Sequence, residues 1–140
     1  MGRPTPDWPW HGRRPVDFLT IDDLLAVAEG VLGEVAVRDI GLLESAVNRP
    51  RGTVFGELAY PTLPEQAAAL MHSIARFHPL VDGNKRLAWS AMRSFLMLNR
   101  KDLTYTVDEA EDFVLSIARG ELDVPEISAW LVAHESDLIE

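Results

Sequence analysis

The chain has 140 residues, of which 47% are apolar, and it carries a formal net charge of -9. That length suits one domain with one core, and the acidic balance argues against a general nucleic-acid-binding protein. The absence of cysteine excludes disulfides and thiolate chemistry, so any metal would need oxygen or imidazole ligands. There is no long uncharged apolar run and no apolar signal-peptide core, so we expect a cytoplasmic protein without a membrane span.

Residues 1–18 are predicted to form an arm ahead of a domain that spans residues 19–140. Four prolines block regular helix in this arm, and two tryptophans lie among them: Pro4, Pro6, Pro9, Pro15, Trp8 and Trp10. The arm is either a tail that docks on the domain or a segment that binds a partner. The sequence leaves both interpretations open.

Apolar residues recur at helical spacing in six stretches, and most of these begin with a residue that can cap a helix. The predicted helices cover roughly residues 20–32, 39–47, 62–77, 87–96, 106–120 and 123–134. The helix that begins near Leu87 is long and apolar, and we expect it to be central. The sequence therefore predicts an all-α single domain of about six helices.

Residues 51–61 interrupt the helical pattern. Two glycines and the β-formers Val54 and Phe55 predict a short β-hairpin or flap there. The segment is either an ordinary connector or an edge that receives a peptide by backbone pairing.

The stretch from His78 to Arg86 reads His-Pro-Leu-Val-Asp-Gly-Asn-Lys-Arg and joins two apolar helical patterns. A chain would place a phosphate-binding loop here, because free N–H groups and the positive dipole end at a helix start attract anions. Lys85 and Arg86 put two cations at this start, where the dipole is already positive, and this misfit indicates an anionic partner. Arg86 can also bind a phosphate through two donors.

The other polar residues of the stretch add further chemistry. His78 can accept a proton from a hydroxyl nucleophile, although a lone histidine beside apolar residues is more often structural. Asp82 is a hard oxygen ligand suited to Mg²⁺, or alternatively the N-cap of the next helix. Gly83 lets the backbone approach a phosphate closely, and Asn84 offers an amide to a phosphate oxygen. Leu80 is an apolar residue that would anchor the loop to the core.

Two other residue patterns bear on function. His72 and His78 are six residues apart and do not share a helix face, which makes a metal hydrolase the weaker interpretation. Arg93 lies two turns beyond Arg86 on one helix face, and it either reaches toward a nucleotide or forms an ion pair.

The motif His-Pro-x-x-Asp-Gly-Asn-Lys-Arg resembles that of the Fic/Doc family, and of its Doc (death-on-curing) branch in particular. Leu80 stands where the family's motif usually has phenylalanine. Tyr60-Pro61-Thr62-Leu63 and the turn Ala118–Leu122 also resemble Doc-type chains.

The resemblance implies a protein kinase reaction. Fic proteins that transfer AMP have a glycine at the position of Lys85, which leaves room for the diphosphate. Doc-type proteins have lysine there and transfer the terminal phosphate of ATP, with elongation factor Tu as the expected target. AMP transfer, and a non-catalytic module that binds a nucleotide or a partner, are the alternatives.

Carried over to this sequence, the resemblance implies a role for each motif residue. His78 would be the general base and Asp82 would hold Mg²⁺. The phosphates of ATP would bind at Gly83, Asn84, Lys85 and Arg86. The predicted flap would align the target segment through Thr53, Val54, Phe55 and Gly56.

Many Fic proteins carry an inhibitory helix with the pattern Ser/Thr-x-x-x-Glu-Gly/Asn. This sequence has no such run, because Thr53-x-x-x-Glu57 is followed by Leu58. The resemblance therefore implies a separate antitoxin, which in the family is a Phd-like protein whose tail folds against the toxin.

Overall fold

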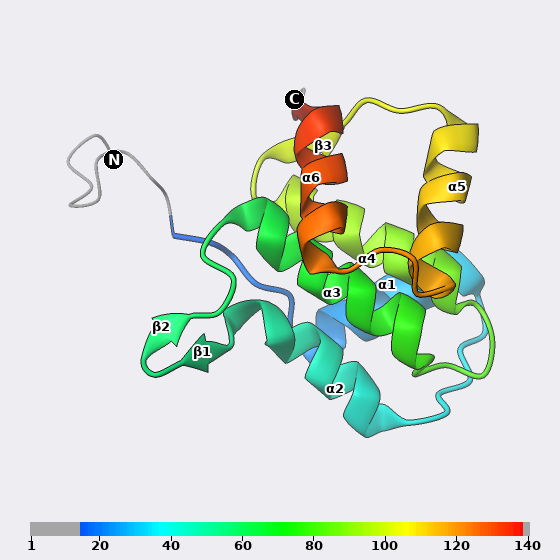
Figure 1. Ribbon diagram of the computed structural model, residues 1–140. Coiled ribbons are helices and arrows are strands. Elements are labelled where there is room, and N and C mark those ends of the chain that lie inside the picture. The colour runs from blue at the N-terminus through cyan, green and yellow to red at the C-terminus, as the bar shows by residue number, and fades with distance from the viewer. Residues whose placement is uncertain (1–14, 139–140) are drawn as a thin grey trace.

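The computed structural model describes residues 15–138, so residues 1–14 of the predicted arm lie outside the described residues. The described chain contains six α-helices, one short 3-10 helix and two two-stranded antiparallel sheets (Figure 1). The α-helices are α1 (Ile21–Leu32), α2 (Ile40–Asn48), α3 (Leu63–Phe77), α4 (Asn84–Leu98), α5 (Val107–Ala118) and α6 (Val124–His134), and η1 spans Arg49–Arg51. The predicted all-α fold is confirmed.

Most helices begin at a residue whose side chain satisfies free backbone N–H groups of the first turn. Capping boxes open α1, α3 and α5, formed by Thr20 with Asp23, Thr62 with Glu65 and Thr106 with Glu109. At the start of α2, the Asp39 carboxylate accepts from the Leu42 N–H at 3.1 Å. At the start of α6, the Glu126 carboxylate accepts from the Asp123 N–H at 2.8 Å. These caps explain why the helices begin where the sequence predicts.

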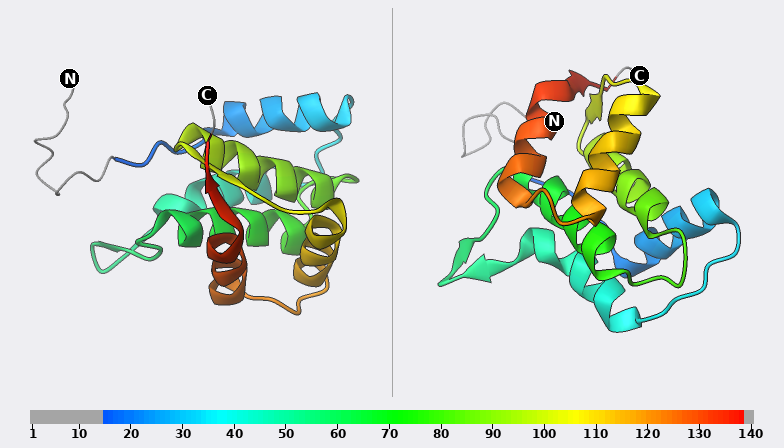
Figure 2. Two further views of the ribbon diagram at one scale, coloured as in Figure 1. Left: turned by 90° about the horizontal axis from the view of Figure 1, so that it is seen from above. Right: turned by 45° about the vertical axis from the view of Figure 1, so that its right-hand side comes forward.

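The centre of the core is the pair α3 and α4. Helix α3 packs against α2, α4, α5 and α6. Its run Ala67–Ala69 is fully buried, and these small side chains let the neighbouring helices approach closely. Helix α4 contributes the buried side chains Leu87, Met92 and Phe95. Helix α1 lies along one side of α4, and α5 and α6 cover the opposite side of the pair (Figure 2). None of the helices between residues 15 and 138 is long and apolar enough to cross a membrane.

The described end of the N-terminal arm docks on α4. The Phe18 ring stacks on Phe95 with the centroids 6.0 Å apart, and Leu19 is buried. Asn99 accepts from the Asp17 N–H and donates to the Asp17 carbonyl, at 2.8 and 2.9 Å. Residues 17–19 are therefore part of the packed domain.

The predicted hairpin is present. Strands β1 (Thr53–Val54) and β2 (Glu57–Leu58) pair in antiparallel fashion, and the turn residues Phe55 and Gly56 both have positive φ, 51° and 81°. This backbone suits the two-residue turns of hairpins. A second pair, β3 (Lys101–Leu103) with β4 (Glu135–Asp137), was not predicted; it ties the end of α6 to the segment after α4.

Candidate active site

The motif forms a tight loop between α3 and α4. His78 ends α3 in the left-handed conformation, with φ 52° and ψ 62°, and Pro79 directs the chain out of the helix. Leu80 is 1% exposed and anchors the loop to the core, as predicted. His78 and Asp82 are exposed on either side of this anchor, so both polar side chains are accessible to a ligand.

The connection between α1 and α2 braces the loop along its length. The Pro79 carbonyl accepts from the N–H groups of Arg38 and Asp39, and the Val81 N–H donates to the Ala36 carbonyl at 2.9 Å. The Arg38 guanidinium donates to the carbonyls of Phe77 and His78, at 2.8 and 2.7 Å. Arg38 was not predicted as a site residue, because nothing local in the sequence connects it to Phe77 and His78, which follow 39 and 40 positions later. The backbone that carries His78 is therefore fixed from a separate segment.

The Asn84 amide faces into the loop. Its Oδ1 accepts from the Leu80 N–H at 2.9 Å, and its Nδ2 donates to the Leu80 carbonyl at 3.0 Å. Both polar atoms of the side chain thus satisfy backbone groups of the loop. Asn84 in this structure holds the loop in shape. The contact of its amide with a phosphate oxygen, expected from the sequence, stays a prediction.

The start of α4 is open, unlike the capped starts of its neighbours. Its N-cap is Gly83, with φ 87°; no side chain caps the helix, and its first turn has no acidic residue. Asp82 does not cap α4: its Oδ1 accepts from the Gly83 N–H at 2.9 Å. A Cβ at position 83 would lie 2.7 Å from the Leu32 side chain, so glycine also permits close packing. Free N–H groups at this end suit an anion.

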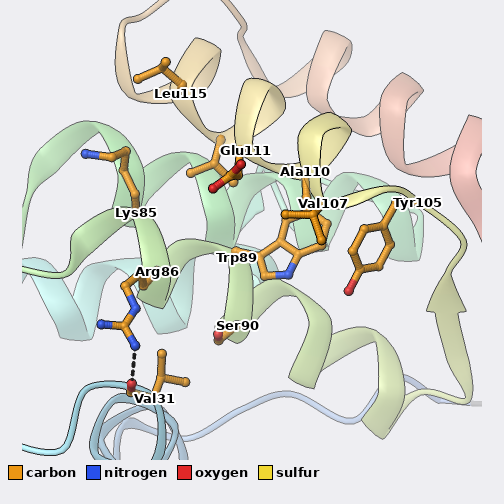
Figure 3. A pocket seen from close by; sticks show the side chains of 11 residues that line it. Val31, Lys85, Arg86, Trp89, Ser90, Tyr105, Val107, Ala110, Glu111 and Leu115 are labelled. Carbon is orange, nitrogen blue, oxygen red and sulfur yellow. Dashed lines mark hydrogen bonds between the residues drawn. The ribbon is translucent and has the colours of Figure 1, made fainter.

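The two motif cations point in different directions (Figure 3). Lys85 is exposed, and Arg86 Nη2 donates to the Val31 carbonyl at 2.7 Å, at the C-terminal end of α1. Lys85 thus brings a positive charge to the open helix start. Part of the Arg86 guanidinium ties α4 to α1.

The predicted flap residues are not brought together with His78. The hairpin adjoins the start of α3, whereas His78 follows its end, and Figures 1 and 2 show the hairpin and the α3–α4 loop on opposite sides of the molecule. A helix of 15 residues separates them, which corresponds to about 22 Å. The segment that does lie against the motif loop is the α1–α2 connection, where Val37 forms a bridge with Leu80.

The remaining sequence candidates have structural partners. Arg93 donates to Asp102 at 2.7 Å and to the Tyr105 hydroxyl at 3.1 Å, which is the ion-pair interpretation. The His72 Nδ1 accepts from Arg49 Nη1 at 3.0 Å, since a guanidinium only donates. Within residues 15–138, no three His, Asp or Glu side chains are grouped so that they could hold a metal ion together.

A groove of about 560 Å³ runs between α4 and α5 and begins at the motif cations (Figure 3). Its lining residues come from both helices, from the end of α1 and from the connection before α5; they include Lys85, Arg86, Trp89, Ser90, Tyr105 and Glu111. Sequence analysis did not find this groove, although Trp89 follows the motif by one helical turn.

Comparisons with known proteins point to the same family as the motif does. The model of the Fic/DOC family matches residues 16–96. Toxin Doc of Mycolicibacterium smegmatis is 46% identical over 118 residues, which cover 82% of this chain and 91% of that protein. The helical fold, the motif loop and these matches define the class: the chain belongs to the Fic/Doc family.

Proposed function

We propose that this protein is the toxin of a toxin–antitoxin system, and that it transfers the γ-phosphate of ATP to a serine or threonine hydroxyl of a translation factor. The observation that carries the proposal is the uncapped start of α4, directly after a braced loop that presents His78 and Asp82. The similarity to Toxin Doc supports the toxin role and implies a partner antitoxin. Such a toxin would act in the cytoplasm.

The terminal phosphate of ATP would bind at the N-terminal turn of α4. The backbone N–H groups that follow Gly83 would donate to its oxygens. Lys85, whose positive charge no acidic side chain in this turn offsets, would neutralise part of the phosphate charge. Phosphoryl transfer depends mainly on positioning and charge stabilisation, so a short loop with few side chains is sufficient.

His78 is the proposed general base. Its imidazole would take the proton of the target hydroxyl, whose oxygen forms a bond to the γ-phosphorus while the bond to the β–γ bridging oxygen breaks and ADP leaves. The loop supports this role, because Arg38 and the αL conformation fix the backbone at His78 while the residue stays exposed. An imidazole nitrogen can both accept and release a proton.

Asp82 is the residue that would hold Mg²⁺. Its side chain is exposed, and one oxygen accepts from the Gly83 N–H, next to the proposed phosphate position. One carboxylate suits Mg²⁺, which takes most of its ligands from water and phosphate oxygens. When bound, the ion would neutralise charge on the transferred phosphate.

The choice of γ-phosphate over AMP rests on Lys85. By the resemblance described above, AMP-transferring Fic proteins have glycine at this position. Lys85 would place a side chain and a charge in the space of the diphosphate. AMP transfer remains the second candidate function, and labelled ATP separates the two.

We propose that the target approaches over an apolar rim beside the loop, formed by Val37, Phe77 and Val81. These side chains are exposed and adjoin His78, Asp82 or the bridge to Leu80. The hairpin, with Phe55 fully exposed at its tip, would be a second and more distant contact. Elongation factor Tu is the target expected from the resemblance, and a Phd-like protein is the expected antitoxin.

The substitution His78→Ala tests whether the protein acts as an enzyme. Expressed in bacteria without an antitoxin, the unchanged protein should stop growth, and the variant should not, while its circular dichroism and ATP affinity stay the same. A folded variant that still stops growth would indicate a binding module instead. Normal growth of bacteria that express the protein without the substitution, in an active form, would contradict the toxin role.

A further inference from the structure

We propose that Arg38 is a positioning residue for the transfer reaction: its guanidinium holds the backbone of His78 in the left-handed conformation that gives the imidazole its direction. The inference rests on the function proposed above, in which His78 is the general base, and extends it to the α1–α2 connection. Arg38 lies 40 positions before His78 and outside the motif. Its contribution would be to the rate of transfer and not to the binding of ATP.

Two local effects act against the backbone conformation of His78. Its φ of 52° and ψ of 62° lie in the left-handed region, which the Cβ of a residue other than glycine disfavours. Pro79 follows directly, and the residue before a proline is driven toward extended conformations. Under these effects alone, His78 would adopt a negative φ, and its side chain would leave the loop in another direction. Contacts from elsewhere in the fold must therefore hold this residue.

The Arg38 side chain supplies contacts that act on His78 itself. Its Nε donates to the His78 carbonyl at 2.7 Å, and its Nη2 donates to the Phe77 carbonyl at 2.8 Å. A carbonyl turns with the ψ angle of its own residue, so the two bonds together fix the backbone at both positions. An extended His78 would lose its bond to Arg38. The guanidinium also brings a positive charge to the C-terminal end of α3, where the helix dipole favours it.

The other hydrogen bonds that brace the loop act on later residues. Backbone N–H groups of the α1–α2 connection donate to the Pro79 carbonyl, and the Asn84 amide bonds the backbone of Leu80. Among the described residues, the Arg38 guanidinium is the group that bonds the His78 carbonyl. Removal of the Arg38 side chain would therefore leave the loop attached to the domain but release the base from its fixed direction.

The test separates the rate of transfer from the binding of ATP. Arg38→Ala removes both side-chain bonds, and Arg38→Lys keeps the charge but lacks the planar fork that reaches two carbonyls. Arg76→Ala is the matched control, because Arg76 is exposed at the same end of α3 but donates to the Ala118 carbonyl of α5, at 3.0 Å. Transfer from γ-labelled ATP to elongation factor Tu gives kcat and the KM for ATP. Growth arrest in bacteria gives a readout that needs no chosen target, and circular dichroism checks folding.

We expect Arg38→Ala to lower kcat by about tenfold to a hundredfold and to leave the KM for ATP unchanged, because the base would face the target hydroxyl only part of the time. Added guanidinium ions, far below the concentrations that unfold proteins, should restore part of the lost kcat, since the Arg38 position is exposed to solvent. Sodium chloride at the same ionic strength should not do so, and guanidinium should not rescue His78→Ala. Arg38→Lys should have an intermediate kcat. Arg76→Ala should keep kcat within about twofold.

An unchanged kcat in folded Arg38→Ala, with His78→Ala inactive, would overturn the inference and leave the proposed function intact. A loss of ATP affinity that accounts for the loss of activity would also overturn it, because Arg38 would then act on the nucleotide. So would a loss of kcat that guanidinium does not restore and that Arg76→Ala shares. If Arg38→Ala does not fold, a kcat of Arg38→Lys equal to that of the unchanged protein would overturn the inference. An unchanged protein that neither transfers phosphate nor arrests growth would instead contradict the proposed function itself.

Discussion

The Asn84 side chain closes the motif loop on the backbone of Leu80, through one accepted and one donated hydrogen bond of 2.9 and 3.0 Å. Leu80 is in turn buried in the core. The motif amide therefore connects the start of α4 to the residue that anchors the loop. Asn84 thus shapes the loop, and its expected contact with a phosphate oxygen stays a prediction.

This relationship predicts the effect of Asn84→Asp. The carboxylate keeps the acceptor for the Leu80 N–H but loses the donor, so the Leu80 carbonyl faces a negative oxygen. The free energy of unfolding should fall by about 1–3 kcal/mol, and transfer activity should fall with it. Urea unfolding measures the first quantity. Asn48→Asp, at an exposed position of α2, should change stability little, and an equal loss there would contradict the account.

Two glycines in different surroundings should respond oppositely to alanine. Gly83→Ala places a Cβ 2.7 Å from Leu32 at a positive φ, and we expect a loss of about 1–2 kcal/mol. Gly30→Ala, inside α1 with nothing within 4 Å, should stabilise the protein by about 0.5–1 kcal/mol. Thermal unfolding measures both changes. A neutral Gly83→Ala would show that the N-cap position relaxes freely.

The two apolar surfaces proposed for target binding can be separated by charge. Val81→Glu, beside Asp82 on the rim, should lower transfer to the target at least tenfold, because a buried carboxylate in the complex lacks a partner. Phe55→Glu, at the hairpin tip, should have a smaller effect. The specificity constant for target phosphorylation measures both, with ATP affinity as the control. A larger loss for Phe55→Glu would indicate that the target binds mainly at the hairpin and would contradict the rim as the main contact.

His72 gives the fold a dependence on pH. Burial of the ring, together with the nearby Arg49 guanidinium, lowers the pKa of His72 from its ordinary value of 6.5, although Asp123 partly opposes this. The unfolded chain then takes up a proton before the folded chain does, so the free energy of unfolding falls as pH drops below about 6.5. The loss stops once the pH is below the folded pKa.

The substitution His72→Gln should remove that part of the pH dependence. Glutamine does not titrate, and its side-chain oxygen can still accept from Arg49. The difference in unfolding free energy between variant and unchanged protein, measured from pH 7.5 to 5, should change in the variant's favour. A difference that is constant with pH would contradict the assignment to His72.

The predicted parts of this structure are those with local signals. Thr20, Thr62 and Thr106 lie three residues before an acidic partner, and each opens a helix. The motif likewise combines a helix end, an apolar anchor and a helix start within nine residues. Local spacing therefore predicted the helices and the position of the loop.

The parts that were missed depend on contacts between distant residues. Arg38 reaches the carbonyls of Phe77 and His78, and β3 pairs with β4 across more than 30 residues, with strands too short to show alternation. The distance of the hairpin from His78 follows from the length of α3, a helix that the sequence predicts, whereas the family resemblance assigned both ends of that helix to one site. The hydrogen bonds of Asn84 likewise depend on what its side chain faces.

The most direct test of the central claim uses ATP labelled separately at its α and γ phosphates. The protein would be incubated with Mg²⁺ and elongation factor Tu, and His78→Ala would be the control. The account predicts label on the target from the γ position alone, and none with the variant. Label from the α position would mean AMP transfer and contradict the interpretation of Lys85, and label that persists in His78→Ala would contradict the proposed base.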